Sequence, residues 1–437
     1  MEGHIGDSVK RRKKNSMSIL RYLADTHCDS STPQLVSLTQ HELDLKGVDG
    51  CLSPGSFFGN RVAIQDVSHQ MEEGKSGHRM FVASGRNVYK IDNECMGEKS
   101  HPDSLKKGKG GMYLPSRKDQ MRVGSEIVPM LQMRAEAQSI HITPADSKGD
   151  SGIILTDTYG RAVCGTLSTR ESSIESVYTV QPDDGAFVCE GGWTGGVLSQ
   201  YSRNIAAIAR HFPKDVSIFD GNIAVRTLNT LYCPNDLTFL ASDLTSSSTD
   251  ATPLIAVAEG NVVTIWDLRI AGTGSRINRI CTGPYAGHVY TIAAANRGCA
   301  LLGASGQDRD VCIWDPRTWK TVDRWRNCLK YEVTSLHFME SNPRYCMVSG
   351  MDYEVVCGSW LNNTSKAFQA STQKKGGGRA AGPATDEGSV ADTTRRERAA
   401  ASFRGTSRWI GLAKAPGESD IFAGVTSDGM MYVSEFM

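Results

Sequence analysis

Alternating hydrophobic and polar positions recur along the second half of the chain as short runs separated by tight turns. The segments AEGNVVTIWDLR (258–269) and ASGQDRDVCIWDPR (304–317) each predict a strand, a turn and a second strand. Their tryptophans, Trp266 and Trp314, lie 48 positions apart. A repeat of this length that ends in Trp-Asp is typical of a four-stranded sheet, which is too small to bury its faces alone. Neighbouring copies must therefore cover one another.

Weaker copies of the same unit extend the pattern along the chain. They are Ile91-Asp92, the turn at Gly160 followed by Val163, Phe219-Asp220, Gly358 with Trp360 on the same strand face, and the turn Asp428-Gly429 with its following strand. Together with Trp266 and Trp314 they predict seven units.

Three segments look irregular: residues 1–57, the Lys- and Gly-rich stretch 93–126 and the low-complexity run 366–402. The other 309 residues divide into seven units of about 44, which is close to the length of a four-stranded blade. The sequence therefore predicts an all-β, seven-bladed β-propeller over 58–437, with six or eight blades as alternatives. We expect a basic, largely disordered tail over 1–57 and two long loop insertions.

The ring needs a closing strand, because the chain ends soon after the third strand of its last unit. The segment NRVAIQDV, which ends at residue 67, alternates suitably. Pairing of residues 60–67 with 430–436 would remove two exposed sheet edges. We expect closure by these segments.

The stretch from Gly287 to Asp315 resembles the WD-repeat, transducin-like family of β-propellers. The resemblance rests on Gly287-His288, Ser305, Asp308 and Trp314-Asp315. It implies that His288, Ser305, Asp308 and Trp314 form a buried hydrogen-bonded tetrad that holds the blade rigid. His288, Ser305 and Asp308 are also the residue types of a hydrolase catalytic triad, but no GxSxG motif surrounds Ser305. The structural interpretation, and a protein that is not an enzyme, is favoured.

Both strong units end in Trp-Asp-x-Arg, formed by Trp266, Asp267 and Arg269 and by Trp314, Asp315 and Arg317. In WD-repeat substrate receptors of cullin-type ubiquitin ligases such a box contacts the adaptor, and the resemblance makes these six residues candidates for partner binding. The alternative is that Arg269 and Arg317 form salt bridges on a blade surface.

Composition excludes several other classes of protein. Lys plus Arg equals Asp plus Glu at 48 each, so no overall field favours nucleic acid or an acidic membrane. The 12 cysteines are scattered without a CxxC pair, and the histidines lack ligand spacing, so we expect no metal and no cofactor. An apolar run near 20 residues is also missing, which argues against a membrane or secreted protein and for the cytoplasm or nucleus.

Local basic clusters keep a second hypothesis open. Lys10, Arg11, Arg12, Lys13 and Lys14 form a candidate nuclear-import signal or nucleic-acid arm. The 93–126 insertion is also basic, although Tyr113 is its only aromatic residue, so a base-stacking surface is not evident. We therefore expect a scaffold for other proteins without a small-molecule substrate, with a nuclear RNA- or chromatin-associated propeller as the alternative.

Overall fold

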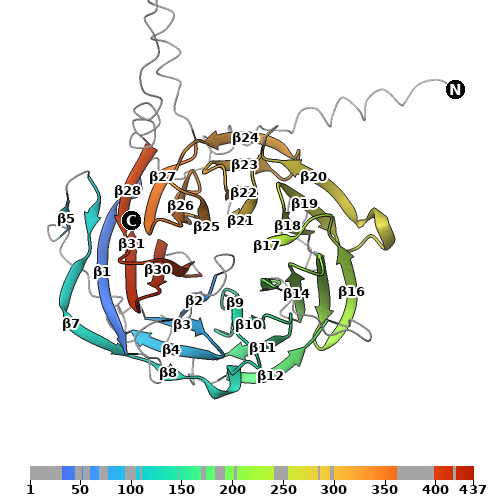
Figure 1. The fold of residues 1–437 in the computed structure, drawn as a ribbon, viewed down its shortest axis with the longest axis horizontal. Helices are drawn as coiled ribbons and strands as arrows, with labels where there is room; N and C mark the ends of the chain where they lie inside the picture. Colours follow the sequence, from blue (N-terminus) through green and yellow to red (C-terminus); the bar gives the residue numbers. More distant parts are fainter. Residues whose placement is uncertain are drawn as a thin grey trace, which may run out of the picture.

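The computed structural model describes residues 32–44, 52, 60–67, 77–93, 105–108, 111–146, 148–168, 174–182, 192–200, 204–240, 254–283, 286–295, 300–361, 398–416 and 420–437. Seven small sheets stand side by side in a ring (Figure 1), which confirms the predicted all-β, seven-bladed propeller. Two 3-10 turns, η4 (Pro129–Leu131) and η5 (Gly272–Ser275), lie in connections between strands. In these ranges no helix has the length and apolar character needed to cross a membrane.

The first three blades follow one another along the chain, each running from its innermost to its outermost strand. Blade 1 consists of β2 (Val62–Asp66), β3 (His78–Ser84), β4 (Asn87–Asn93) and β8 (Glu126–Ile127). Blade 2 consists of β9 (Ala137–Ile142), β10 (Ser151–Asp157), β11 (Ala162–Leu167) and β12 (Ile174–Val180). Blade 3 consists of β13 (Thr194–Leu198), β14 (Ile205–Arg210), β15 (Asp215–Asp220) and β16 (Ile223–Asn229).

The next three blades repeat this order. Blade 4 consists of β17 (Pro234–Leu240), β18 (Leu254–Glu259), β19 (Val262–Asp267) and β20 (Arg276–Cys281). Blade 5 consists of β21 (Val289–Ala295), β22 (Leu301–Gly306), β23 (Val311–Asp315) and β24 (Lys320–Trp325). Blade 6 consists of β25 (Val333–Phe338), β26 (Tyr345–Gly350), β27 (Glu354–Ser359) and β28 (Ala399–Arg404).

Blade 7 combines both ends of the described chain. Its strands are β29 (Trp409–Lys414), β30 (Asp420–Thr426), β31 (Met430–Phe436), β1 (Leu35–Asp44) and β7 (Ser116–Gly124). β1 pairs antiparallel with β31, and Thr39 lies opposite Val433. The prediction that residues 60–67 close the ring is therefore wrong, because β2 pairs with β3 as the innermost strand of blade 1. The closing strand lies inside the segment expected to be a disordered tail.

The 93–126 insertion contributes to the sheets although it was expected to be a loop. β7 pairs in parallel with β1 and covers the outer edge of blade 7. A small hairpin, β5 (Lys106–Lys107) and β6 (Tyr113–Leu114), lies beside β28 of blade 6. β28 itself begins within the low-complexity run 366–402. Strand pairing with distant parts of the chain therefore orders residues whose local sequence has no strong strand signal.

The core consists of apolar clusters that lie between neighbouring blades. Trp266 of blade 4 packs with Ile218 and Leu228 of blade 3, and Trp314 of blade 5 packs with Val263 of blade 4. Each sheet is covered on both faces, so strands such as β19, VVTIWD, are buried at every position. This is the mutual covering that the repeat predicts, and it makes the ring the stable unit.

Blade 6 explains why one repeat lacks its tryptophan. Gly358 occupies the Trp position of β27, and a Cβ there would lie 2.4 Å from Cη2 of Trp325, which belongs to blade 5. The indole that fills this interface thus comes from the neighbouring blade. Trp360, just after β27, is fully buried and donates its Nε1–H to the carbonyl of Pro343 at 2.7 Å.

Strand direction defines two faces of the ring. The antiparallel order places the turns between second and third strands, and the connections between blades, on the face where each innermost strand begins. We call it the entry face, and the other the opposite face. Backbone bonds from Gly260 to Cys233 and from Val289 to Gly260 link such a turn to the connections on either side of it.

Candidate functional site

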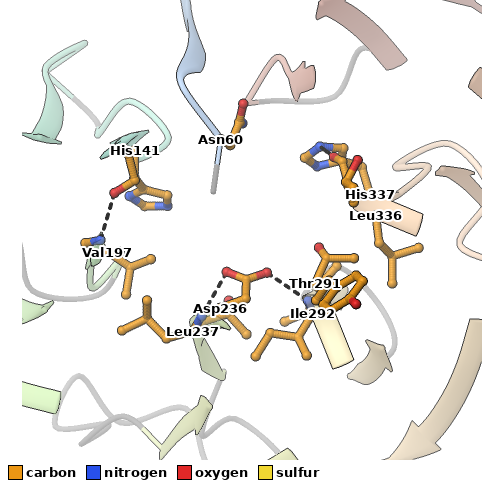
Figure 2. A pocket seen from close by; sticks show the side chains of 18 of the residues that line it. Asn60, His141, Val197, Asp236, Leu237, Thr291, Ile292, Leu336 and His337 are labelled. Atoms are coloured by element: carbon orange, nitrogen blue, oxygen red, sulfur yellow. Dashed lines mark hydrogen bonds between the residues drawn. The ribbon is translucent and has the colours of Figure 1, made fainter. Parts of the chain in front are cut away.

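The innermost strands enclose a cavity of about 270 Å³ on the axis of the ring (Figure 2). Five consecutive blades, from blade 2 to blade 6, contribute residues of β9, β13, β17, β21 and β25 to its wall, and Asn60 contributes from the connection before blade 1. Among the described residues, the innermost strands of adjacent blades belong to separate sheets and form no common ladder. Polar side chains in this wall can therefore reach the backbone of the next blade.

Asp236 of β17 is the carboxylate of this wall, and it joins blade 4 to blade 5. Its Oδ2 accepts the N–H of Ile292 at 2.8 Å, and its Oδ1 accepts the N–H of Leu237 at 2.8 Å. Burial raises the pKa of this carboxyl to about 7, although these bonds oppose the rise by stabilising the ionised form. Asp236 thus links β17 to β21, and its carboxyl group titrates near neutral pH.

Two histidines make similar links elsewhere in the wall. Nδ1 of His141 accepts the N–H of Leu198 at 3.4 Å and joins blade 2 to blade 3, while Nε2 of His337 donates to the carbonyl of Leu412 at 2.8 Å and joins blade 6 to blade 7. Burial lowers the pKa of each imidazole to about 4. Both rings are therefore neutral at physiological pH.

Ser335 and His337 resemble a catalytic pair in spacing, but their hydrogen bonds do not suit catalysis. Ser335 Oγ lies 3.0 Å from Nε2 of His337. The same Nε2 carries the proton that it donates to Leu412, so this nitrogen has no lone pair with which to accept the serine proton. The arrangement is that of an interblade link.

The four residues of the expected tetrad lie in blade 5 with the following partners. Ser305 Oγ donates to the carbonyl of Asp310 at 2.8 Å, and the carboxylate of Asp308 accepts the N–H of Gly287 at 2.9 Å. His288 is exposed and stacks on Tyr290, with ring centroids 6.4 Å apart, while the Trp314 side chain is 1% exposed. These bonds fasten the connection entering blade 5 to its turn, and they join neighbouring backbone groups where one shared side-chain network was expected.

A chain of side-chain bonds that the sequence analysis missed occurs in blade 4. Trp266 Nε1 donates to Thr264 Oγ1 at 3.0 Å, and Thr264 donates to Glu259 Oε1 at 2.5 Å. Glu259 Oε2 also accepts the N–H groups of Leu231 and Tyr232. The available signal was Thr264, which stands two positions before the indole and therefore on the same strand face.

The Trp-Asp-x-Arg boxes fold back on themselves at the opposite face. Arg269 Nε and Nη2 donate to the two carboxylate oxygens of Asp267 at 2.9 and 2.7 Å. Arg317 Nε and Nη2 donate to the two carboxylate oxygens of Asp315 at 3.0 and 3.1 Å. Hydrogen bonds from Arg269 lower the pKa of Asp267. The salt-bridge alternative thus describes both boxes.

Access differs within these boxes. Trp266 and Trp314 are 5% and 1% exposed, whereas the Arg269 and Arg317 side chains are 60% and 35% exposed. A partner can reach only the arginine end of each motif, since the indoles pack between blades. The basic cluster Lys10 to Lys14 lies outside the described residues.

The entry face carries a set of exposed apolar and aromatic side chains that sequence reasoning did not find. All of them lie in turns or interblade connections on this face: Met130 (55% exposed), Phe212 (64%), Leu231 (44%), Tyr232 (47%), Tyr331 (47%) and Met351 (37%). Isolated apolar residues in polar loops have no periodicity, so no strand or helix pattern reveals them. Aromatic residues of this kind are enriched where proteins bind other proteins.

Comparison with known proteins adds no assignment. No protein-family model matches the chain, and no curated protein matches it.

Proposed function

We propose that this propeller is a non-catalytic scaffold of the WD-repeat type that binds other proteins through its entry face. The observation that carries the proposal is the set of exposed apolar and aromatic residues on that face. Phe212, Tyr232 and Tyr331 come from blade 3, the connection to blade 4 and the connection to blade 6, so they span much of the ring. Rigid aromatic side chains on a stable platform are typical anchors of a protein interface.

The charges on this face complement the apolar groups. Exposed cations stand in its turns and connections: Arg86, Arg134, Lys214, Arg309, Arg326 and Lys330. Exposed carboxylates among the described residues of the same turns are fewer, with Asp308 and Asp428 as examples. A partner with acidic residues around an apolar centre fits this distribution.

A triple variant, Phe212→Ser with Tyr232→Ser and Tyr331→Ser, tests this function. Full-length protein and variant are purified from cells with their partners, and recovered proteins are identified by mass spectrometry at about 0.15 M and about 0.5 M salt. We expect partners that remain bound to the unchanged protein at high salt and are lost with the variant. The variant and the unchanged protein should have similar melting temperatures. Recovery of the same partners by both proteins would contradict the proposal.

A more specific version makes the chain a substrate receptor of a cullin-type ubiquitin ligase, with Arg269 and Arg317 contacting the adaptor. The two exposed arginines lie on adjacent blades and support it. Each guanidinium has five N–H donors, and some remain after the hydrogen bonds to its own aspartate are made. Exchange of Arg317 to Asp should abolish co-purification of the adaptor, and unchanged recovery would contradict this version.

The alternative is a nuclear propeller that contacts RNA or chromatin through Lys10 to Lys14 and the basic insertion. The exposed Lys106 and Lys107 of the β5–β6 hairpin favour it. Binding of this kind should weaken steeply with salt. Deletion of residues 10–14 followed by imaging tests nuclear import separately.

A further inference from the structure

The cavity on the axis of the ring has the size of a small-molecule site. Its volume of about 270 Å³ lies near the lower end of the range for such sites, about 300–1,000 Å³. Voids left by packing are rarely larger than one water molecule, about 30 Å³. The innermost strands therefore enclose far more space than imperfect packing between blades would leave.

The two histidines of the wall each have one ring nitrogen that the links between blades do not use. Nδ1 of His141 accepts the N–H of Leu198, so the proton of this neutral ring is on Nε2. Nε2 of His337 donates to the carbonyl of Leu412, so its Nδ1 is an acceptor. Neither remaining nitrogen has a partner among the described residues, and both are accessible. A donor and an acceptor thus border the same central space (Figure 2).

The wall offers no positive charge to a ligand. Its described residues include no Lys or Arg, and both imidazoles are neutral because burial lowers the pKa of each to about 4. Asp236 is the only acid of this wall, and each of its carboxylate oxygens already accepts a backbone N–H. An anion would lose its hydration without finding a counter-charge, and a cation would compete with those N–H groups. A neutral ligand therefore suits the cavity best.

The rest of the wall combines hydroxyl groups with apolar surface. The hydroxyl groups belong to Thr238, Tyr290, Thr291, Thr334 and Ser335, and the apolar surface to Val197, Ala293, Ala294 and Leu336. A hydroxyl group both donates and accepts hydrogen bonds, whereas apolar side chains pack against C–H groups. A small ring that carries several hydroxyl groups matches both kinds of surface.

We propose that the axial cavity binds a neutral polyol of the size of one sugar or cyclitol ring. His141 donates to one ligand hydroxyl and His337 accepts from another, so the ligand connects blades 2 and 6 across the central space (Figure 2). The site is independent of the scaffold function, because Phe212, Tyr232 and Tyr331 of the entry face do not belong to its wall.

Methyl NMR of the full-length protein tests both binding and its location, with D-glucose, D-galactose, D-mannose and myo-inositol as probes. At least one probe should bind with a Kd of about 0.1–5 mM, the range for a ligand of about a dozen non-hydrogen atoms. The methyl resonances of Val197, Ile292 and Leu336, which line the cavity, should shift with occupancy. Those of Ile223 and Val225 on the outer strand of blade 3 should stay in place, because both side chains are exposed far from the axis.

Two conservative variants each remove one cavity group and retain the link between blades. His141→Asn keeps an acceptor for the N–H of Leu198 and removes the Nε2–H donor. His337→Gln keeps a donor for the carbonyl of Leu412 and removes the Nδ1 acceptor. Each variant should weaken binding about three- to tenfold, the effect of one neutral hydrogen bond.

The matched control is His211→Asn. Nδ1 of His211 lies 3.0 Å from the carbonyl of Pro234 in an interblade connection outside the cavity wall, so this variant should bind as the unchanged protein does. D-glucose 6-phosphate should bind more weakly than D-glucose, and D-glucosamine should bind no more tightly.

Several results would overturn the proposal. They are unshifted cavity methyls with every probe up to about 50 mM, full binding by both variants of the wall histidines, and shifts confined to methyls outside the cavity. Tighter binding of D-glucosamine or of D-glucose 6-phosphate than of D-glucose would overturn the neutral class of ligand. Loss of entry-face partners in the triple variant would leave polyol binding unchanged, so the two proposals fail separately.

Discussion

Blades 5 and 7 have similar architecture but depend on the chain in different ways. Blade 5 is built from consecutive strands between Val289 and Trp325, joined by short turns. Blade 7 takes three strands from the C-terminal end and receives β1 from the other end of the chain. The difference means that blade 5 forms from local contacts, whereas blade 7 forms only when the ring closes.

Removal of residues 1–44 should have the largest effect on this comparison. Without β1, Leu38, which is 1% exposed, no longer packs in the cluster with Phe422 and Tyr432, and β31 presents a free edge. We expect aggregation or loss of the cooperative melting transition. The control, removal of residues 1–31, should melt as the full chain does. Equal melting of the two truncated proteins by calorimetry would contradict the closing role of β1.

Asp420 of blade 7 provides the next test. Its carboxylate accepts the N–H groups of Glu340 and Ser341, at 2.6 and 2.9 Å, and therefore joins blade 7 to blade 6. Asp420→Asn retains one acceptor oxygen and turns an NH₂ group toward the other N–H, which should cost about 2–3 kcal/mol of unfolding free energy. Denaturant unfolding measures it, and a loss below about 0.5 kcal/mol would show that this link is dispensable.

The histidine links predict how pH affects stability at the contact between blades 6 and 7 and at the contact between blades 2 and 3. The pKa of His337 is about 4 in the folded protein and about 6.5 when unfolded, so the unfolded state binds more protons between these values. Stability from this group is therefore present above pH 6.5 and is lost as pH falls toward 4, by about 1–3 kcal/mol. His337→Gln, whose Nε2 can still donate to Leu412, should flatten this decline.

His141 is the comparison for that experiment, because it joins blades 2 and 3, which need no closing strand. Its pKa is also about 4. We expect His141→Asn to flatten the decline by a similar amount, since the linkage depends on the shift and not on the blade. Asp236 acts in the other direction, because its raised pKa of about 7 makes its contribution fall as pH rises from about 4 to 7. A decline of stability on acidification that is as steep in the His337→Gln and His141→Asn variants as in the unchanged protein would contradict the histidine assignment.

Arg317 of blade 5 should give the smallest effect. Its ion pair with Asp315 lies at the surface, where solvent screens it, so Arg317→Ala should change the unfolding free energy by less than about 1 kcal/mol. The same measurement on Trp314→Phe, inside blade 5, serves as a packing comparison. A large loss from Arg317→Ala would show that the box supports the fold more than its exposure indicates.

The sequence alone determined the repeat and the strand type and predicted seven units with six or eight as alternatives, because every blade must bury two faces and therefore repeats a short apolar pattern near Trp266, Trp314 and their weaker copies. It also located the third strands, including the one that lacks its tryptophan at Gly358.

Only the tertiary structure decided which strand closes the ring, which residues face the central cavity and which surfaces stay uncovered. Asp236, His141 and His337 look like ordinary strand residues until adjacent blades bring the backbone of Ile292, Leu198 and Leu412 within reach. A local pattern specifies how a strand alternates. The partner of an edge strand depends on chain segments hundreds of residues away, which local alternation does not encode.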